Sequence, residues 1–169
     1  MLDNVQKELN RFAKYVIQQS RSNLTKSKKN ASKQLYNSLD SNIVVSKNSF
    51  QLEFLMEDYG VFQDKGVSGV KKKYNTPYSY TDKMPPPSKM DKWIVKRGIA
   101  PKDEKGRFIK RKSLQFMIAR SIYNNGIKPS LFFTKPFEKA FKNLDKDIIK
   151  AYALDVENLL ETTTKDNLK

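Results

Sequence analysis

The sequence predicts an α+β protein. Apolar residues recur at spacings of three and four over residues 4–22 and again beyond residue 113, which is typical of amphipathic helices. Between these regions, residues 50–56 alternate in the manner of a strand with one buried face. The chain has 169 residues, and one domain usually spans about 100–200 residues. We therefore expect a single domain over residues 1–169.

The first expected element is an amphipathic helix over residues 4–22, with Asp3 as its N-cap. Its apolar stripe comprises Val5, Leu9, Phe12, Val16 and Ile17. Residues 23–34 are polar and rich in lysine, which favours a loop or a poorly packed helical stretch. A short helical turn is expected over residues 35–39.

A β-hairpin is expected next, because β-branched residues at 43–45 precede a plausible turn at Lys47 and Asn48. The alternating run that follows has a buried face formed by Phe50, Leu52 and Phe54. Residues 59–70 predict a short strand or bend that leads into a flexible loop.

The next helices are expected between glycine and proline breaks. A short helix begins near Ser88 and stops at Gly98. A charged loop, which could form a small hairpin, covers residues 100–112. A further helix covers residues 113–125 and ends at Gly126.

The C-terminal part predicts two more helices. Residues 131–133 favour a short edge strand or an anchoring turn. Thr134 is the expected N-cap of a helix with Pro136 in its first turn. A separate helix is expected from Asp145 to about residue 162, so that Asp145 and Asp147 are first-turn charges favoured by the helix dipole.

The basic charge is concentrated in one stretch. The net charge is +15, and residues 71–113 carry fourteen basic and four acidic residues, a net charge of +10. Residues 41–70 carry a net charge of −2. A localised excess favours a polyanionic partner over a lysine-rich surface that merely reflects a biased genome. We expect a core formed by about 1–66 and 113–162, with a basic arm inserted over about 67–112.

The residue types present disfavour most enzyme chemistry. Without Cys or His, the chain can form no disulfide or thiolate metal site and has no histidine general base. No motif for a metal, a cofactor or a catalytic group is visible. No apolar run approaches the roughly 20 residues that span a bilayer, and the first residues do not resemble a signal peptide. We expect a soluble, intracellular, non-enzymatic protein with no cofactor.

The predicted arm combines residues suited to two kinds of partner. Tyr and Pro suit protein contacts, and the candidate contact residues are Tyr74, Tyr78, Tyr80, Pro85, Pro86, Pro87 and Trp93. Lys and Arg with interleaved Tyr also suit phosphates and stacked bases. The candidate DNA-facing residues are Lys71, Lys72, Lys73, Lys105, Arg107, Lys110 and Arg111. The partner is therefore either nucleic acid or the acidic faces of neighbouring subunits.

Two segments of the chain carry specific motifs. One runs Tyr-Gly-Val-Phe-Gln-Asp-Lys-Gly from Tyr59 to Gly66, and the other, Ile127 to Phe137, contains Pro-x-x-Phe-Phe-x-x-Pro-Phe. With the N-terminal helix and the hairpin, they resemble the head–tail joining, neck or tail-completion proteins of tailed phages over roughly residues 5–160. The residues that carry the likeness are Tyr59, Gly60, Phe62, Asp64, Gly66, Pro129, Phe132, Phe133, Pro136 and Phe137.

The chain departs from the family in two places. The short loop after the strand is replaced by the long 67–112 segment, and Ser32-Lys33-Gln34 stands where the family has Thr-Gly before a leucine. The second segment also holds the clustered phenylalanines Phe132, Phe133 and Phe137. These are candidates for packing against a neighbouring subunit, with the protein's own core as the alternative.

The resemblance implies a structural role in the virion. Such proteins are α+β subunits that assemble as closed rings, commonly six- or twelve-fold, between portal or adaptor rings and the tail. The expected partners are other copies of the chain, portal, adaptor or other neck proteins, tail proteins and the DNA that passes through the lumen, with no membrane contact. The protein would lie in the host cytoplasm during assembly and then in the neck or upper tail of the virion.

Two other functions remain open on the sequence. A free nucleic-acid-binding protein would use the basic 71–113 segment. An enzyme such as a nuclease would depend on the carboxylates of Glu57, Asp58 or Asp64, and the missing His argues against it.

Overall fold

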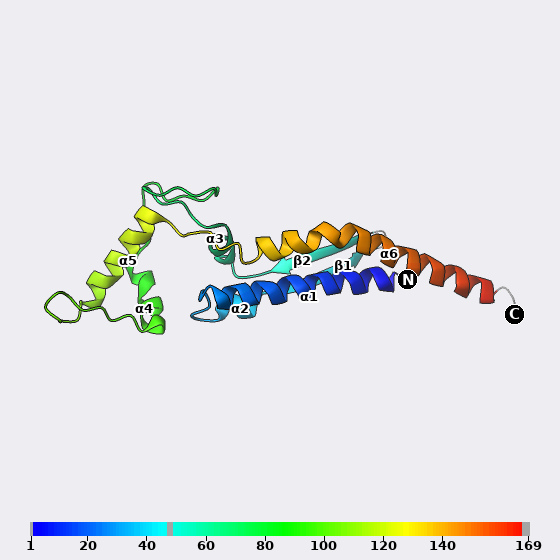
Figure 1. The fold of residues 1–169 in the computed structure, drawn as a ribbon, viewed down its shortest axis with the longest axis horizontal. Helices are drawn as coiled ribbons and strands as arrows, with labels where there is room; N and C mark the ends of the chain where they lie inside the picture. Colours follow the sequence, from blue (N-terminus) through cyan, green and yellow to red (C-terminus); the bar gives the residue numbers. More distant parts are fainter. Residues whose placement is uncertain (1, 47–48, 167–169) are drawn as a thin grey trace. The chain divides into compact units, whose positions relative to one another are not determined.

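The computed structural model describes residues 2–46 and 49–166 as helices, connecting loops and a two-stranded sheet (Figure 1). The helices are α1 (Asp3–Lys26), α2 (Gln34–Ser38), α3 (Gly60–Lys65), α4 (Asp91–Arg97), α5 (Arg111–Asn125) and α6 (Thr134–Asp166), with a 3₁₀ turn, η1 (Pro87–Met90), before α4. Strands β1 (Asp40–Ser46) and β2 (Ser49–Leu55) pair antiparallel, with Asp40 opposite Leu55 and Ser46 opposite Ser49. The predicted α+β class is confirmed, while the expected turn residues Lys47 and Asn48 lie outside the described residues.

The chain divides into two compact units. Unit 1 comprises Met1–Leu24, Asn37–Met56 and Phe132–Lys169, and unit 2 comprises Thr25–Tyr36 and Glu57–Leu131. Unit 1 therefore contains the hairpin and α6, and unit 2 contains α3, α4 and α5. Three stretches that we expected in the core with the hairpin, residues 25–36, 57–66 and 113–131, group instead with the basic 67–112 segment.

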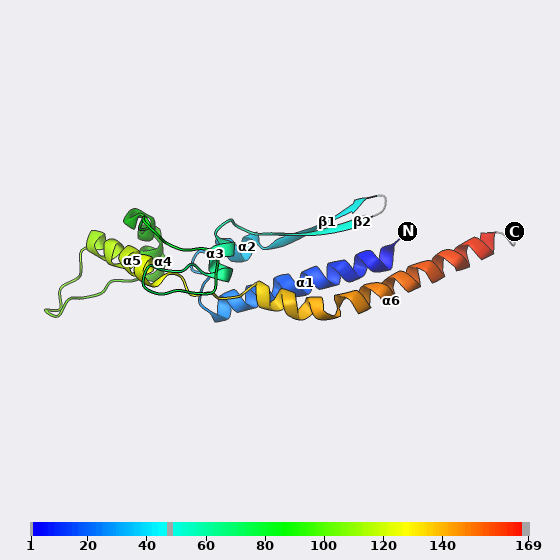
Figure 2. The ribbon, with the colours of Figure 1, turned by 90° about the horizontal axis from the view of Figure 1, so that it is seen from above.

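In unit 1, α1 and α6 run antiparallel beside each other with the hairpin alongside (Figures 1 and 2). The buried face of α1 comprises Val5, Phe12, Ala13, Val16, Ile17, Ser20 and Leu24. Leu24 is fully buried and continues the apolar stripe two turns beyond Ile17. For this reason α1 extends to Lys26, into the first residues of the segment 23–34 for which we expected a loop or a poorly packed helical stretch.

Aromatic rings join the three elements of unit 1. The ring of Phe54 on β2 lies edge to face with Phe12 on α1, at 6.1 Å between centroids, and with Phe133 and Phe137, at 5.2 and 5.9 Å. Phe132 is only 1% exposed. The clustered phenylalanines thus pack within unit 1. Phe50, Leu52 and Phe54 share a face of β2 as expected, but they are half-buried rather than buried.

Two expected element types are wrong. Residues 60–65 form helix α3 rather than a strand or bend, and the backbone N–H of Gly60 donates to the Glu57 carbonyl at 2.7 Å. A single helix, α6, replaces the two expected after Thr134, because no Gly or Pro interrupts the apolar pattern beyond Phe137. Asp145 and Asp147 therefore lie in mid-helix and not in a first turn.

Unit 2 is built from short elements. Helix α4 ends at Gly98, whose φ of 61° is left-handed, as predicted. A bridge between Lys102 and Phe108 forms the small hairpin in the charged loop. The buried apolar residues of unit 2 are Leu35, Val67, Ile94, Leu114 and Ala119. Among the described residues, no helix has both the length and the apolar character needed to cross a membrane.

Candidate functional site

The two segments that carry the phage-protein resemblance meet at one junction in unit 2. Val67 and Ile127 exchange backbone hydrogen bonds of 2.9 and 2.8 Å. The backbone N–H groups of Ser130 and Leu131 both donate to the Asp64 carbonyl at 3.0 Å. The Ser130 hydroxyl donates to the carbonyl of Gln63, a residue 67 positions earlier in the chain. Segments that are distant in sequence are therefore held together mainly through backbone groups.

Glycine is required on both sides of this junction. Gly66 has a φ of +75°, and a Cβ there would lie 2.6 Å from the Ile127 carbonyl oxygen. Gly126 has a φ of +71°, and its Cβ would lie 2.1 Å from the Val67 carbonyl oxygen. A side chain at either position would be strained in this conformation and would also collide with the backbone of the opposite segment. Close approach of two backbones thus explains Gly66, the last residue of the first resembling segment.

Two lysines and one aspartate lie close to one another at the junction. The amine of Lys29 donates to the Lys128 carbonyl at 3.3 Å. Burial lowers the pKa of this amine, the positive charge of Lys128 lowers it further, and the Asp64 carboxylate opposes both effects. Asp64 is only 4% exposed, which leaves a substrate little access to the carboxylate that a nuclease would use.

Four predicted site residues line one aromatic cleft in unit 2. Tyr59 and Phe62, from the resembling segment, face Tyr78 and Tyr80, from the predicted arm, across a cleft of about 580 Å³. The rings of Phe62 and Tyr78 lie edge to face with centroids 4.8 Å apart. Burial raises the pKa of both Tyr59 and Tyr80. The cleft is lined by aromatic side chains, three of them tyrosines, and such a composition suits contact with another protein.

The first part of the predicted arm is bonded into unit 2. The Ser68 N–H donates to the Tyr78 carbonyl at 2.8 Å, and the Tyr80 N–H donates to the Ser68 carbonyl at 2.9 Å. Further hydrogen bonds tie Lys71 and Lys72 to the Asn124 carbonyl at the end of α5. The flexible loop that we expected after residue 66 is therefore replaced by an ordered segment, because its backbone groups find partners on residues 123–127.

The remaining arm candidates lie outside the aromatic cleft. Tyr74 is half-buried, and the Lys72 amine lies 5.6 Å from the centre of its ring. Trp93 on α4 is 42% exposed. Pro86 is exposed, and Pro85 and Pro87 are half-buried before η1. The structure thus separates the predicted contact residues into Tyr78 and Tyr80 in the cleft, Tyr74 beside Lys72, and the prolines and Trp93 in η1, α4 and the residues just before them.

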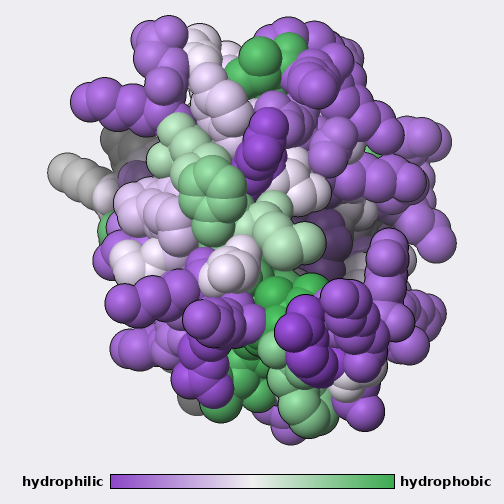
Figure 3. Space-filling view, turned by 90° about the vertical axis from the view of Figure 1, so that its left-hand side faces the viewer, coloured by the Kyte–Doolittle hydropathy of each residue, from purple (hydrophilic) through white to green (hydrophobic). Residues whose placement is uncertain are grey.

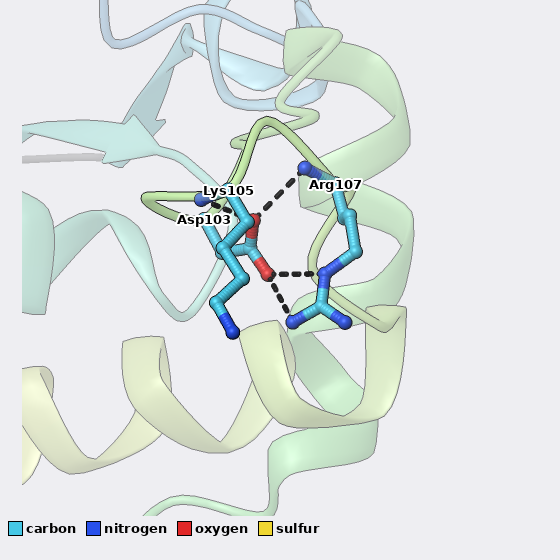
Figure 4. A network of polar contacts seen from close by, with 3 residues as sticks. All are labelled: Asp103, Lys105 and Arg107. Atoms are coloured by element: carbon cyan, nitrogen blue, oxygen red, sulfur yellow. Dashed lines mark hydrogen bonds and ion pairs between the residues drawn. The ribbon is translucent and has the colours of Figure 1, made fainter.

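The basic candidates differ in whether an acidic side chain lies beside them. The Arg107 guanidinium binds the Asp103 carboxylate at 2.9 and 3.0 Å, whereas the Lys105 side chain points away from it (Figure 4). Hydrogen bonds from the Arg107 backbone, helped by its side chain, hold the pKa of Asp103 below its ordinary value. Arg111 lies 3.7 Å from the Asp91 carboxylate. The exposed lysines at 71, 72, 73, 105 and 110 are the stronger candidates for a phosphate backbone.

Sequence reasoning missed how completely the charge separates between the two units. Unit 2 carries 21 basic and seven acidic residues, a net charge of +14, which leaves unit 1 with +1. The charge counts along the sequence already showed the basic excess, but we assigned it to the expected arm, about 67–112, and not to the whole of unit 2. With the true grouping, residues such as Lys26, Lys29 and Lys128 join the basic unit.

No protein-family model, no characterised protein and no solved structure matches this chain.

Proposed function

We propose that this chain is a structural protein of the neck of a tailed bacteriophage. There it connects portal or adaptor rings to the tail and forms part of the conduit through which DNA is packaged and ejected. The observation that supports this most directly is the junction in unit 2. The segments 59–66 and 127–137 resemble neck proteins separately in sequence, and in the fold residues 130 and 131 of the second are bonded to residues 63 and 64 of the first.

The distribution of surfaces also supports a role in assembly. Unit 1 joins its elements through an aromatic cluster and keeps exposed apolar residues on its long helix. Unit 2 carries almost the whole net charge and an aromatic cleft. A ring subunit needs different surfaces for neighbours on each side, and a basic surface is compatible with DNA nearby.

The decisive experiment removes the gene from the phage genome that encodes it. We expect lysates with DNA-filled heads and separate tails, and we expect the full-length chain supplied from a plasmid to restore joined, infectious particles. Electron microscopy and plaque counts measure the two outcomes. Joined particles at the normal yield without the gene would overturn the proposal.

A second candidate function is free nucleic-acid binding by unit 2. Its net charge of +14, with exposed lysines on the ordered 71–73 segment, is the observation that favours it. It requires that the isolated protein retain DNA at low salt with a steep loss of affinity as salt rises. A neck protein needs weaker retention, because tight binding would stall the passage of DNA.

A further inference from the structure

The C-terminal half of α6 exposes an apolar stripe. Asp155 binds the start of α1, so α6 passes the end of its helical neighbour at this point (Figure 2). Apart from Leu154 (52%), which lies on the other side of the helix, the exposed apolar residues are Ile149 (68%), Tyr152 (53%), Val156 (36%), Leu159 (47%) and Leu160 (64%). At about 100° of rotation per residue, they fall within about 100° of one another around the helix. A stripe of this width normally packs against another element.

The same part of α6 is acidic. Residues 149–163 carry three acidic residues, Asp155, Glu157 and Glu161, and one basic residue, Lys150. Glu157 and Glu161 are both exposed and lie one turn apart next to the stripe. A partner for this segment, which we call the α6 tail (residues 149–163), should therefore combine apolar and basic side chains.

Helix α5 presents this combination on its outer face. Leu114 and Ala119 are buried, whereas Phe116 and Met117 are 48% and 54% exposed. Lys112 and Arg120 lie one turn before and one turn after Phe116, so basic and aromatic side chains alternate along one face. Viewed from the side of α4 and α5, the surface is mostly hydrophilic and is crossed by an apolar strip (Figure 3).

We propose that the α6 tail of one copy docks on the outer face of α5 in a second copy. The apolar stripe packs on Phe116 and Met117, and Glu157 and Glu161 lie against Lys112 and Arg120. Helix α5 has 15 residues, a length of about 22 Å, which is also the length of the α6 tail. Because the two surfaces differ, each copy can bind two neighbours, and the contact closes a ring if the rotation allows it.

The choice of a second copy as occupant rests on the proposed function, in which copies of the chain assemble. Charge complementarity supports it independently. The outer face of α5 belongs to a unit with a net charge of +14. The α6 tail is acidic, although lysines elsewhere in unit 1 bring the net charge of that unit to +1. Opposite charges favour this pairing and disfavour contact between two copies of unit 2.

Charge reversal on the full-length chain tests the contact. Glu157→Lys with Glu161→Lys reverses the tail, and Lys112→Glu with Arg120→Glu reverses the α5 face. We expect sedimentation velocity to show concentration-dependent association of the wild type and a loss of affinity of about tenfold or more for either pair alone. The four substitutions together should restore most of the affinity, because the charges are again opposite.

Matched controls separate local charge from net charge. Asp40→Lys with Glu138→Lys changes exposed acids of unit 1 outside the stripe, and Lys83→Glu with Lys89→Glu changes exposed lysines of unit 2 outside α5. Both controls should associate nearly as the wild type does. Circular dichroism checks that every variant is folded.

A cross-linking measurement covers the case in which charge variants misfold. The chain has no Cys, so Leu159→Cys and Met117→Cys create single thiols in two separate proteins. On mild oxidation of an equimolar mixture, we expect the mixed disulfide to exceed each homodimer by well over the twofold ratio that random pairing gives. A ratio of about two or less would overturn the proposed contact.

Two further results would overturn the inference: a wild type that stays monomeric at every concentration, or an α5 variant that associates as well as the wild type. Neither result would by itself refute the phage-neck function. That function is judged by the joining of heads and tails in the deletion experiment, which does not require this particular contact.

Discussion

At Gly126 the backbone φ is +71°, and a Cβ would lie 2.1 Å from the Val67 carbonyl oxygen. Gly126→Ala should therefore cost about 2 kcal/mol or more of the free energy of unfolding, as conformational strain adds to a backbone collision. The matched control is Gly98→Ala, because Gly98 has a φ of +61° but a Cβ there meets nothing within 4 Å. It should cost only about 1 kcal/mol. Equal losses of the free energy of unfolding, measured by urea denaturation, would show that the close approach at the junction does not add to the cost.

Asp155 is a second residue whose role depends on its surroundings. Burial alone would raise its pKa, but hydrogen bonds from the backbone N–H groups of Asn4 and Val5, at about 3.0 Å, and from the Asn4 side chain hold the pKa below its ordinary value. The carboxylate thus satisfies N–H groups at the start of α1 that have no partner within the helix.

The lowered pKa predicts a dependence on acid. A carboxyl group with a lowered folded-state pKa contributes stability above its unfolded pKa of about 3.9 and loses it as the pH falls through the folded value. Asp155→Asn should lower the melting temperature at pH 7 by roughly a few degrees, and the difference from the wild type should shrink below about pH 4. Asp145→Asn, an exposed site on the same helix, is the control. A difference that stays constant with pH would contradict the carboxylate's role.

Among the elements, the hairpin makes its aromatic contacts with the helices through Phe54. Phe54 contacts Phe12 on α1 and Phe137 on α6. Phe54→Ala should destabilise the protein by about 3 kcal/mol, because both contacts and their buried area are lost. Val44→Ala on β1, where the side chain is already 39% exposed, should cost less than about 1 kcal/mol. Similar denaturation midpoints for the two variants would show that the aromatic cluster does not hold the hairpin.

For the molecule as a whole, the separation of charge predicts that unit 2, and not unit 1, makes the contact with DNA that the proposed function requires. Changing Lys71, Lys72 and Lys73 together to Glu should weaken retention on DNA and reduce the slope of log affinity against log salt by up to about 3. Changing Lys139, Lys142 and Lys146 on α6 to Glu alters the net charge of the protein by the same amount, but in unit 1. This change should have a much smaller effect on DNA retention and on the salt slope. Filter binding over a salt series measures both slopes. Equal effects would mean that only total charge matters.

Much of the fold was predictable from local patterns. The N-terminal helix, the alternating strand and the helix ends at Gly98 and Gly126 depend on side-chain spacing and on conformations that glycine adopts easily. Errors arose where nearby residues were ambiguous. Helix α3 was mistaken for a strand or bend because its six residues are too few to show a helical period.

The candidate site was predictable in its parts but not in its arrangement. Tyr59 and Tyr80 were both singled out, yet only the fold shows that they line one cleft. Arg107 was a candidate DNA-facing residue, and the fold pairs it with Asp103 four residues earlier. Such pairings depend on the loop conformation, which charge counts alone do not define.

By itself the sequence determined the α+β class, the main helices and strands, and the total charge of this protein, because these follow from residue type and local spacing. Only the tertiary structure decided which segments share a core, where the charge is gathered and which apolar residues stay exposed on α6. Contacts such as Asp64 with Ser130, or Asp155 with Asn4, join residues far apart in the chain. Their energies depend on how the whole chain packs, and no local pattern encodes that.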